Sequence, residues 1–208
     1  MTDHLIAAHG GTLVNLLVDE KRAQELKQAS RDYPSWDLTE RQLCDLELIM
    51  NGGFSPLTGF LGRKDYESVC ESMRLANGTL WSMPIMLDIP EALATRIERG
   101  AKLALRDPEG VMLAVMHVED VWQPELTAEA ERIFGTKSPE HPGVAHLLQR
   151  TNPYYVGGRI EALQLPTHYD FRPLRHTPAE LRHELGKLGW RRVVACQMPQ
   201  SRAAMHLD

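Results

Sequence analysis

The residues with the clearest chemical potential lie in the stretch "QSRAAMH", near the end of the printed sequence. Gln200, Arg202 and His206 follow the apolar run "RVVAC", which is typical of a short strand buried in a parallel sheet. Anions often bind directly after such a strand, at backbone N–H groups and a helix N-terminus. Arginine can form two hydrogen bonds to phosphate or sulfate, and histidine can neutralise charge that develops in phosphoryl or adenylyl transfer. The pattern predicts an oxyanion site, and a solvent-exposed tail is the equally weighted alternative.

Two other motifs resemble ligand-binding motifs, but structural roles fit them better. The segment "NGGFSPLTGF" (51–60) lacks the lysine of a P-loop and follows no strand, so we expect a turn between two helices. His141 and His146 are five residues apart, whereas zinc-binding histidines on a helix are usually four apart. We therefore expect no protein-bound metal.

Helical patterns precede and follow the NGGFSPLTGF segment. Residues 19–30 consist of good helix formers. In the next helix, from Thr39 to Met50, Thr39 and Gln42 can form a capping box and Gly52–Gly53 can end the helix. A third helix is expected over residues 63–73.

The pattern changes to β-strands from residue 80. The turn Asp107–Gly110 predicts a hairpin, and Gly157–Gly158 suggest a bulge or sharp bend in a later strand. Methionines in the strand after the hairpin turn are expected in the core. The expected strands are 83–89, 101–107, the longer strand after Gly110 and 153–165, with short helices over 90–100 and 141–150.

A boundary is predicted after this β-rich part. Residues 166–176 contain two prolines and no periodicity, so they are expected to form a linker. Thr177, Pro178 and Glu180 then provide a helix start, and a buried strand should follow. A helix leading into a buried strand is typical of the opening of a doubly wound α/β domain. We expect domains at 1–167 and 168–208.

Composition limits the classes of function. The 208 residues carry a net charge of −5, which argues mildly against binding of duplex nucleic acid. The three cysteines are widely spaced, so a disulfide framework is not expected. No apolar run is long enough for a membrane span, and no export signal is seen at the start. These features predict a cytoplasmic protein without a membrane partner.

Several long strings resemble sulfate adenylyltransferase, that is, ATP sulfurylase. They are "CDLELIMNGGFSPLTGFL", "RLANGTLWSMPIMLDI", "EHPGVAHLL", "YYVGGRIEALQLPTHYDFRPLRHTPAELR" and "GWRRVVACQ". The resemblance is strongest to the branch of fungal enzymes and bacterial fusions with APS kinase. It implies an α+β, PUA-like, β-rich N-terminal domain, followed by the first helix and strand of an α/β Rossmann-like nucleotidyltransferase domain.

The resemblance also implies an activity and its partners. The family joins ATP and sulfate into adenosine 5′-phosphosulfate (APS) and pyrophosphate, with Mg²⁺ accompanying ATP. A fused or associated APS kinase and a homo-oligomer are further expectations, and the PUA-like domain is expected to be a scaffold rather than an RNA-binding module.

The family's catalytic motif reads Gln-Thr-Arg-Asn-Pro-x-His-x-x-His, and two registers fit this chain. Without a gap, Gln197 matches the glutamine and His206 the second histidine. With three residues inserted, Gln200, Arg202 and His206 match the glutamine, the arginine and the first histidine. We favour the second register, in which Ala203 and Ala204 replace Asn and Pro and the second histidine has no counterpart.

The expected function is therefore that of a sulfate adenylyltransferase, with Arg202 and His206 as catalytic residues and Gln200 as a substrate ligand. Because the motif is altered and incomplete, these 208 residues alone are expected to be inactive. A non-catalytic scaffold within a sulfurylase–APS kinase fusion and a PUA-type RNA-binding module are the alternatives.

Overall fold

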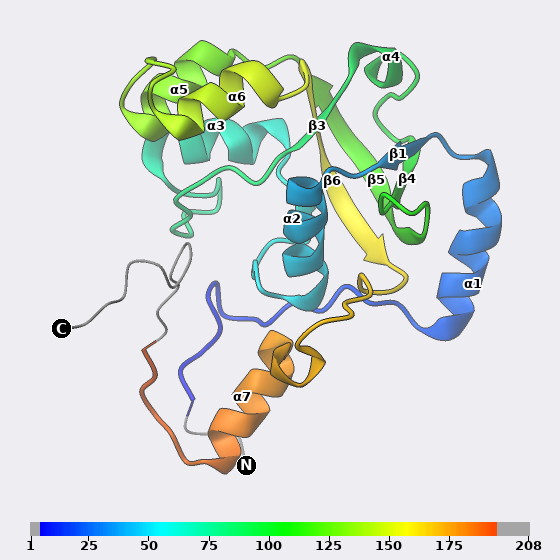
Figure 1. Ribbon diagram of the computed structural model, residues 1–208, viewed down its shortest axis with the longest axis vertical. Helices are drawn as coiled ribbons and strands as arrows, with labels where there is room; N and C mark the ends of the chain where they lie inside the picture. Colours follow the sequence, from blue (N-terminus) through cyan, green and yellow to red (C-terminus); the bar gives the residue numbers. More distant parts are fainter. Residues whose placement is uncertain (1–4, 195–208) are drawn as a thin grey trace.

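A computed structural model describes residues 5–194 and places six strands in one mixed sheet (Figure 1). The order of the main path is β1-β4-β5-β6-β2, and β3 also pairs with β6. Only β1 and β4 run parallel; the other neighbours are antiparallel. The strands are β1 (Ser35–Asp37), β2 (Gly59–Phe60), β3 (Leu87–Ile89), β4 (Lys102–Arg106), β5 (Met112–Trp122) and β6 (Tyr154–Ala162).

Helices cover both faces of the sheet and one of its ends. They are α1 (Glu20–Ala29), α2 (Glu40–Asn51), α3 (Arg63–Ser72), α4 (Glu91–Ala94), α5 (Leu126–Phe134), α6 (Pro142–Arg150) and α7 (Pro178–Lys187), with 3₁₀ turns η1 (Ser30–Asp32) and η2 (Arg172–Leu174). In Figure 1, α3, α5 and α6 gather at one end of the sheet, whereas α1 lies along the side of β1 and β4. None of the helices found in residues 5–194 has both the length and the apolarity for a bilayer span.

The helix starts follow from local side-chain caps. Thr39 and Gln42 form the expected capping box at α2, and Gly52 ends this helix in the left-handed conformation. Thr177 and Glu180 form the second box, at α7. Each box satisfies backbone N–H groups that the first helical turn leaves without partners. The predicted positions of α1, α2, α3, α6 and α7 are confirmed to within about two residues.

The hairpin prediction at residues 107–110 is also confirmed. Asp107 accepts hydrogen bonds from the backbone N–H groups of Glu109 and Val111 through one carboxylate oxygen. β4 and β5 then pair antiparallel on either side of the turn. Met112 and Met116 of β5 are buried, as expected.

The predicted irregularity at Gly157–Gly158 lies on the neighbouring strand. Val118 pairs with Gly158 and Asp120 pairs with Gly157, so Glu119 is the extra residue and the bulge belongs to β5. The glycines are needed for close approach, because a Cβ at Gly158 would meet the carbonyl oxygen of His117. The position of the disturbance was thus predicted correctly, but the strand was not.

Two predicted elements are shorter in the structure, and one helix was missed. The strand expected over 83–89 begins only at Leu87, and the helix expected over 90–100 is confined to Glu91–Ala94. Pro84 has no backbone N–H to donate in a sheet, which is consistent with the late start of β3. Helix α5 (residues 126–134) was not predicted from the sequence. It packs against α3 and α6.

The core is divided by the sheet. On one face, Leu46, Ile49 and Met50 of α2 pack against Leu105 and Met116 in the largest cluster. On the other face, Leu26 of α1 packs against Ala104, Met112 and Val115. Alternation along β4 and β5 explains this division, because successive side chains point to opposite faces. Leu26 therefore fixes α1 to the second face.

Residues 163–194 contain little regular structure besides α7. The expected linker contains the 3₁₀ turn η2, and none of the residues of α7 is buried. Residues 191–194 form no strand, and Val193 and Val194 are exposed. The buried strand expected for "RVVAC" is therefore not present in its described part; no described strand lies beside it to supply the hydrogen bonds of a parallel pair. The final residues of that run lie outside the described part.

Candidate functional site

The residues predicted to do chemistry, Gln197, Gln200, Arg202 and His206, lie outside the described residues, which end at 194. Their roles stay predictions. The candidate sites that can be built from the structure lie elsewhere, on the sheet and among the helices at its end.

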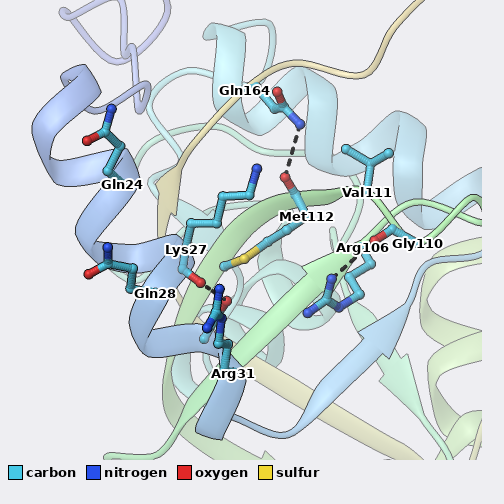
Figure 2. A pocket seen from close by; sticks show the side chains of 10 residues that line it. Gln24, Lys27, Gln28, Arg31, Arg106, Gly110, Val111, Met112 and Gln164 are labelled. Carbon is cyan, nitrogen blue, oxygen red and sulfur yellow. Dashed lines mark hydrogen bonds between the residues drawn. The ribbon is translucent and has the colours of Figure 1, made fainter.

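A pocket of about 550 Å³ lies between α1 and the β4–β5 hairpin (Figure 2). Figure 2 shows Gln24, Lys27, Gln28 and Arg31 on the α1 side of this pocket, and Arg106 and Met112 on the hairpin side. Lys27 and Arg31 are four residues apart along a continuous helical run, so they share one side of it. We call this the α1–hairpin pocket.

Two hydrogen bonds hold the hairpin side of the α1–hairpin pocket. Arg106 donates from Nη1 to the carbonyl oxygen of Gly110 at 3.1 Å. Gln164 donates from Nε2 to the carbonyl oxygen of Met112 at 3.3 Å. Both side chains are drawn with these bonds in Figure 2. The remaining guanidinium donors of Arg106 stay available for another group.

The pocket is basic in an acidic chain. Lys27, Arg31 and Arg106 line it, and within the described part of the chain none of the three has a carboxylate within salt-bridge distance. The described lining residues include no Asp or Glu. This arrangement can bind an anion.

A buried carboxylate, Asp88, lies between α2 and the end of α6. Its side chain is 5% exposed and accepts hydrogen bonds from Arg41 at 2.5 Å and from Gln42 at 2.8 Å. The backbone and side-chain amides of Asn152 each donate at 2.9 Å. Because every oxygen has partners, the pattern fits a structural anchor.

A second buried carboxyl, Glu129, contacts two phenols. Tyr66 donates to its Oε2 at 2.9 Å and Tyr155 at 3.0 Å. Burial raises the pKa of Glu129, and the two phenol hydrogen bonds oppose that rise. The same surroundings raise the pKa of both tyrosines and, to about 12, that of the Cys70 thiol. Glu129 joins α5 to α3 and β6, and burial of the Cys70 thiol, with Glu129 nearby, favours its protonated form.

The two motifs that the sequence gave structural roles behave accordingly. Residues 51–60 form the end of α2, a turn and β2. His141 precedes α6 and lies 5.0 Å from Phe134, centroid to centroid, whereas His146 is exposed. Among residues 5–194, no group of three or more His, Cys, Asp or Glu side chains could hold a metal ion.

The mixed sheet with helices on both faces and at one end corresponds to a PUA-like protein. The family described as "PUA-like domain" matches residues 6–165, so the chain belongs to that family. The match ends close to the boundary expected after residue 167.

Among characterised proteins, the chain is related to sulfate adenylyltransferases. It is 49% identical to the enzyme of Saccharomyces cerevisiae over 203 residues, covering 96% of this chain and 39% of that protein. It is 48% identical to the enzyme of Aspergillus fumigatus over 202 residues, covering 95% of this chain and 34% of that protein. The chain thus spans between one third and two fifths of the length of these relatives.

The chain is also similar to a solved structure. "Hexameric APS kinase from Thiobacillus denitrificans" matches with a TM-score of 0.72 and 37% identity, over 90% of this chain and 33% of that one. The 48–49% identity to the two sulfate adenylyltransferases confirms the resemblance seen in the sequence.

Sequence reasoning did not find the α1–hairpin pocket. The spacing of Lys27 and Arg31 in the sequence does indicate a basic side of the helix, because residues four apart lie on the same side. The meeting with Arg106 could not be read from the sequence, because it depends on how Leu26 packs against the sheet.

Proposed function

We propose that this chain is part of a sulfate adenylyltransferase, which forms APS and pyrophosphate from ATP and sulfate. The observation that carries the proposal is the 48–49% identity to two such enzymes over at least 95% of the chain. The PUA-like domain serves as a scaffold for the catalytic domain in this account.

The proposed division is a PUA-like domain over 1–167 and, over 168–208, a linker and the start of a Rossmann-like nucleotidyltransferase domain. The exposure of residues after the PUA-like match supports it. Leu181 and Leu188 of the α7 region and Trp190 after it are about half exposed, and α7 buries none of its residues. Apolar side chains exposed in this way are typical of a surface that packs against further structure.

The loop "QSRAAMH" would bind the reacting anions. In the favoured register, Gln200 and Arg202 hold sulfate or phosphate oxygens, and His206 stabilises charge on the nucleotide phosphates; Gln197 takes the role of the glutamine in the other register. A sulfate oxygen attacks the α-phosphorus of ATP, a P–O bond to sulfate forms, and the bond to pyrophosphate breaks. Mg²⁺ bound to ATP would screen the charge of the phosphates.

Ala203 and Ala204 weaken this loop in our account. Alanine cannot donate or accept hydrogen bonds as asparagine does, and it does not fix the backbone as proline does. Loss of one preorganised donor can cost roughly 10²–10³ in rate. We therefore expect the 208-residue chain alone to release no pyrophosphate from ATP and sulfate. A cytoplasmic location is part of this proposal.

A second candidate function is a scaffold associated with an APS kinase. The solved structure from Thiobacillus denitrificans favours it, because that protein is a hexameric APS kinase. Under this reading the chain forms homo-oligomers and holds the kinase without catalysing adenylyl transfer.

Activity of a chimeric enzyme distinguishes the adenylyltransferase function from the scaffold function. Residues 1–167 of this chain replace the aligned part of the yeast enzyme, and APS formation is measured with ATP, sulfate and Mg²⁺. The first proposal expects an active chimera, whereas a folded chimera without activity favours the scaffold function.

A further inference from the structure

The α1–hairpin pocket combines three features that call for a ligand. It is large enough for a phosphorylated small molecule, at about 550 Å³. Three cations line it: Lys27, Arg31 and Arg106. Three amide side chains that can donate further hydrogen bonds also line it, namely Gln24, Gln28 and Gln164.

Arg22, on the same helix as Lys27, pairs with Glu25 and Glu161. Lys27 and Arg31 instead repel one another across one helical turn, which is unfavourable in the absence of a counter-charge. An anion bound between these two residues and Arg106 would attract all three cations and so offset their mutual repulsion.

We propose that the α1–hairpin pocket binds a small molecule with two linked phosphate or sulfate groups. Each phosphoryl group carries about −1.5 to −2 charge at pH 7, so two of them match three cations. The planar donors of Arg31 and Arg106 contact oxygens in pairs, and Lys27 contributes a point charge. The bond to Gly110 holds Arg106 in place, which reduces the entropy that this side chain loses on binding.

The site is independent of the loop containing Arg202. It uses residues 24–31, 106–112 and 164, all of which are described. Its failure would therefore leave the proposed adenylyl transfer untouched, and failure of that reaction would leave this site untouched.

The test is calorimetric titration of the full 208-residue chain with pyrophosphate, sulfate and phosphate, without metal ions. We expect pyrophosphate to bind most tightly and its affinity to fall as salt is raised. The variant Arg31→Gln should weaken binding roughly fivefold to tenfold, and the triple variant Lys27→Gln, Arg31→Gln, Arg106→Gln should abolish it.

Three controls decide the assignment. The charge-matched triple variant Arg63→Gln, Lys137→Gln, Lys187→Gln removes exposed cations that pair elsewhere, and it should bind as the parent chain does. Arg202→Gln is titrated beside them, to separate binding at the loop from binding at the pocket. Circular dichroism establishes that each variant folds.

Three outcomes would overturn the proposal. The first is equal weakening in both triple variants, which indicates non-specific attraction. The second is loss of binding in Arg202→Gln alone, which assigns the anion to the loop. The third is displacement of pyrophosphate by a short single-stranded RNA at lower concentration, which indicates a nucleic-acid surface.

Discussion

The guanidinium of Arg22 donates two hydrogen bonds to the carboxylate of Glu161, at 2.8 and 3.1 Å. These two residues join α1 to the central strand β6, and His117 of β5 contacts the same carboxylate at 2.5 Å. Leu26 lies one turn after Arg22 and is buried against the sheet. The Arg22–Glu161 contact and the burial of Leu26 together fix α1 against the sheet. They thereby set the positions of Lys27, in this helix, and of Arg31, just after it.

Acid should weaken this attachment. The hydrogen bonds from Arg22, helped by His117, lower the pKa of Glu161 to about 2 from an ordinary value of 4.5. A lowered folded-state pKa gives stability that is fully present above the unfolded pKa and is lost as pH falls from 4.5 towards 2. After discounting for solvent, we expect a loss of about 1–2 kcal/mol of unfolding free energy from this group.

Denaturant unfolding at pH 6 and pH 2.5 measures that loss. Glu161→Gln should lower stability at pH 6 and reduce the difference between the two pH values. Glu67→Gln, which removes the exposed partner of Arg63, is the matched control and should change little. An unchanged pH dependence in Glu161→Gln would contradict the assignment.

The pH dependence of stability that Glu129 contributes should have the opposite sign to that of Glu161. Burial raises its pKa, so its contribution to stability is largest below the unfolded pKa and falls as pH rises through and above about 4.5. Glu129→Gln keeps an acceptor for Tyr66 and Tyr155 without the buried charge. We expect unfolding free energy at pH 7.5 to be unchanged or to rise by up to about 1 kcal/mol.

Glu129→Ala provides the contrast, because it leaves two buried phenols without an acceptor and opens a cavity. Its expected cost is about 2–4 kcal/mol, measured by thermal or urea unfolding. Equal destabilisation by the two substitutions would show that the negative charge itself is needed.

Asp88 should tolerate no loss of acceptors. Asp88→Asn replaces one carboxylate oxygen by an NH₂ group, so donors from Arg41, Gln42 and Asn152 can no longer all be satisfied. We expect destabilisation of about 2–4 kcal/mol in urea unfolding. Asp37→Asn, on an exposed residue of β1, is the control. A change below about 0.5 kcal/mol at Asp88 would refute its role as an anchor.

Local signals in the sequence predicted much of the fold. Thr39 with Gln42, and Thr177 with Glu180, fix helix starts because a capping box needs only residues of one turn. Asp107 sets the hairpin for the same reason. The bulge at Glu119 was assigned to the wrong strand, since only the pairing register tells which strand carries the extra residue.

The sites were less predictable. The basic pocket depends on the packing of Leu26 against Ala104 and Met112, which brings Arg31 near Arg106. Helix α5 was missed; its Leu126 and Ile133 pack against a cluster that includes Trp122 of β5 and Tyr155 of β6. The loop with Arg202 and His206 was found by motif, and its geometry stays a prediction.

The altered loop gives a further prediction. In a chimera that carries residues 1–208 in place of the aligned part of the yeast enzyme, Ala203 and Ala204 should lower kcat by roughly 10²–10³. The double substitution Ala203→Asn, Ala204→Pro should raise kcat at least tenfold above that of the unsubstituted chimera. Steady-state APS formation measures both. No recovery in a folded double variant would contradict the favoured register, and recovery only after Pro199→Arg would support the other.

The most direct measurement is kcat/KM for sulfate of the chimera with residues 1–167 of this chain in the yeast enzyme. We expect a value within about tenfold of the parent enzyme, because the PUA-like domain acts as a scaffold and leaves the catalytic loop unchanged. A correctly folded chimera of the parent's oligomeric size that forms no APS would contradict it.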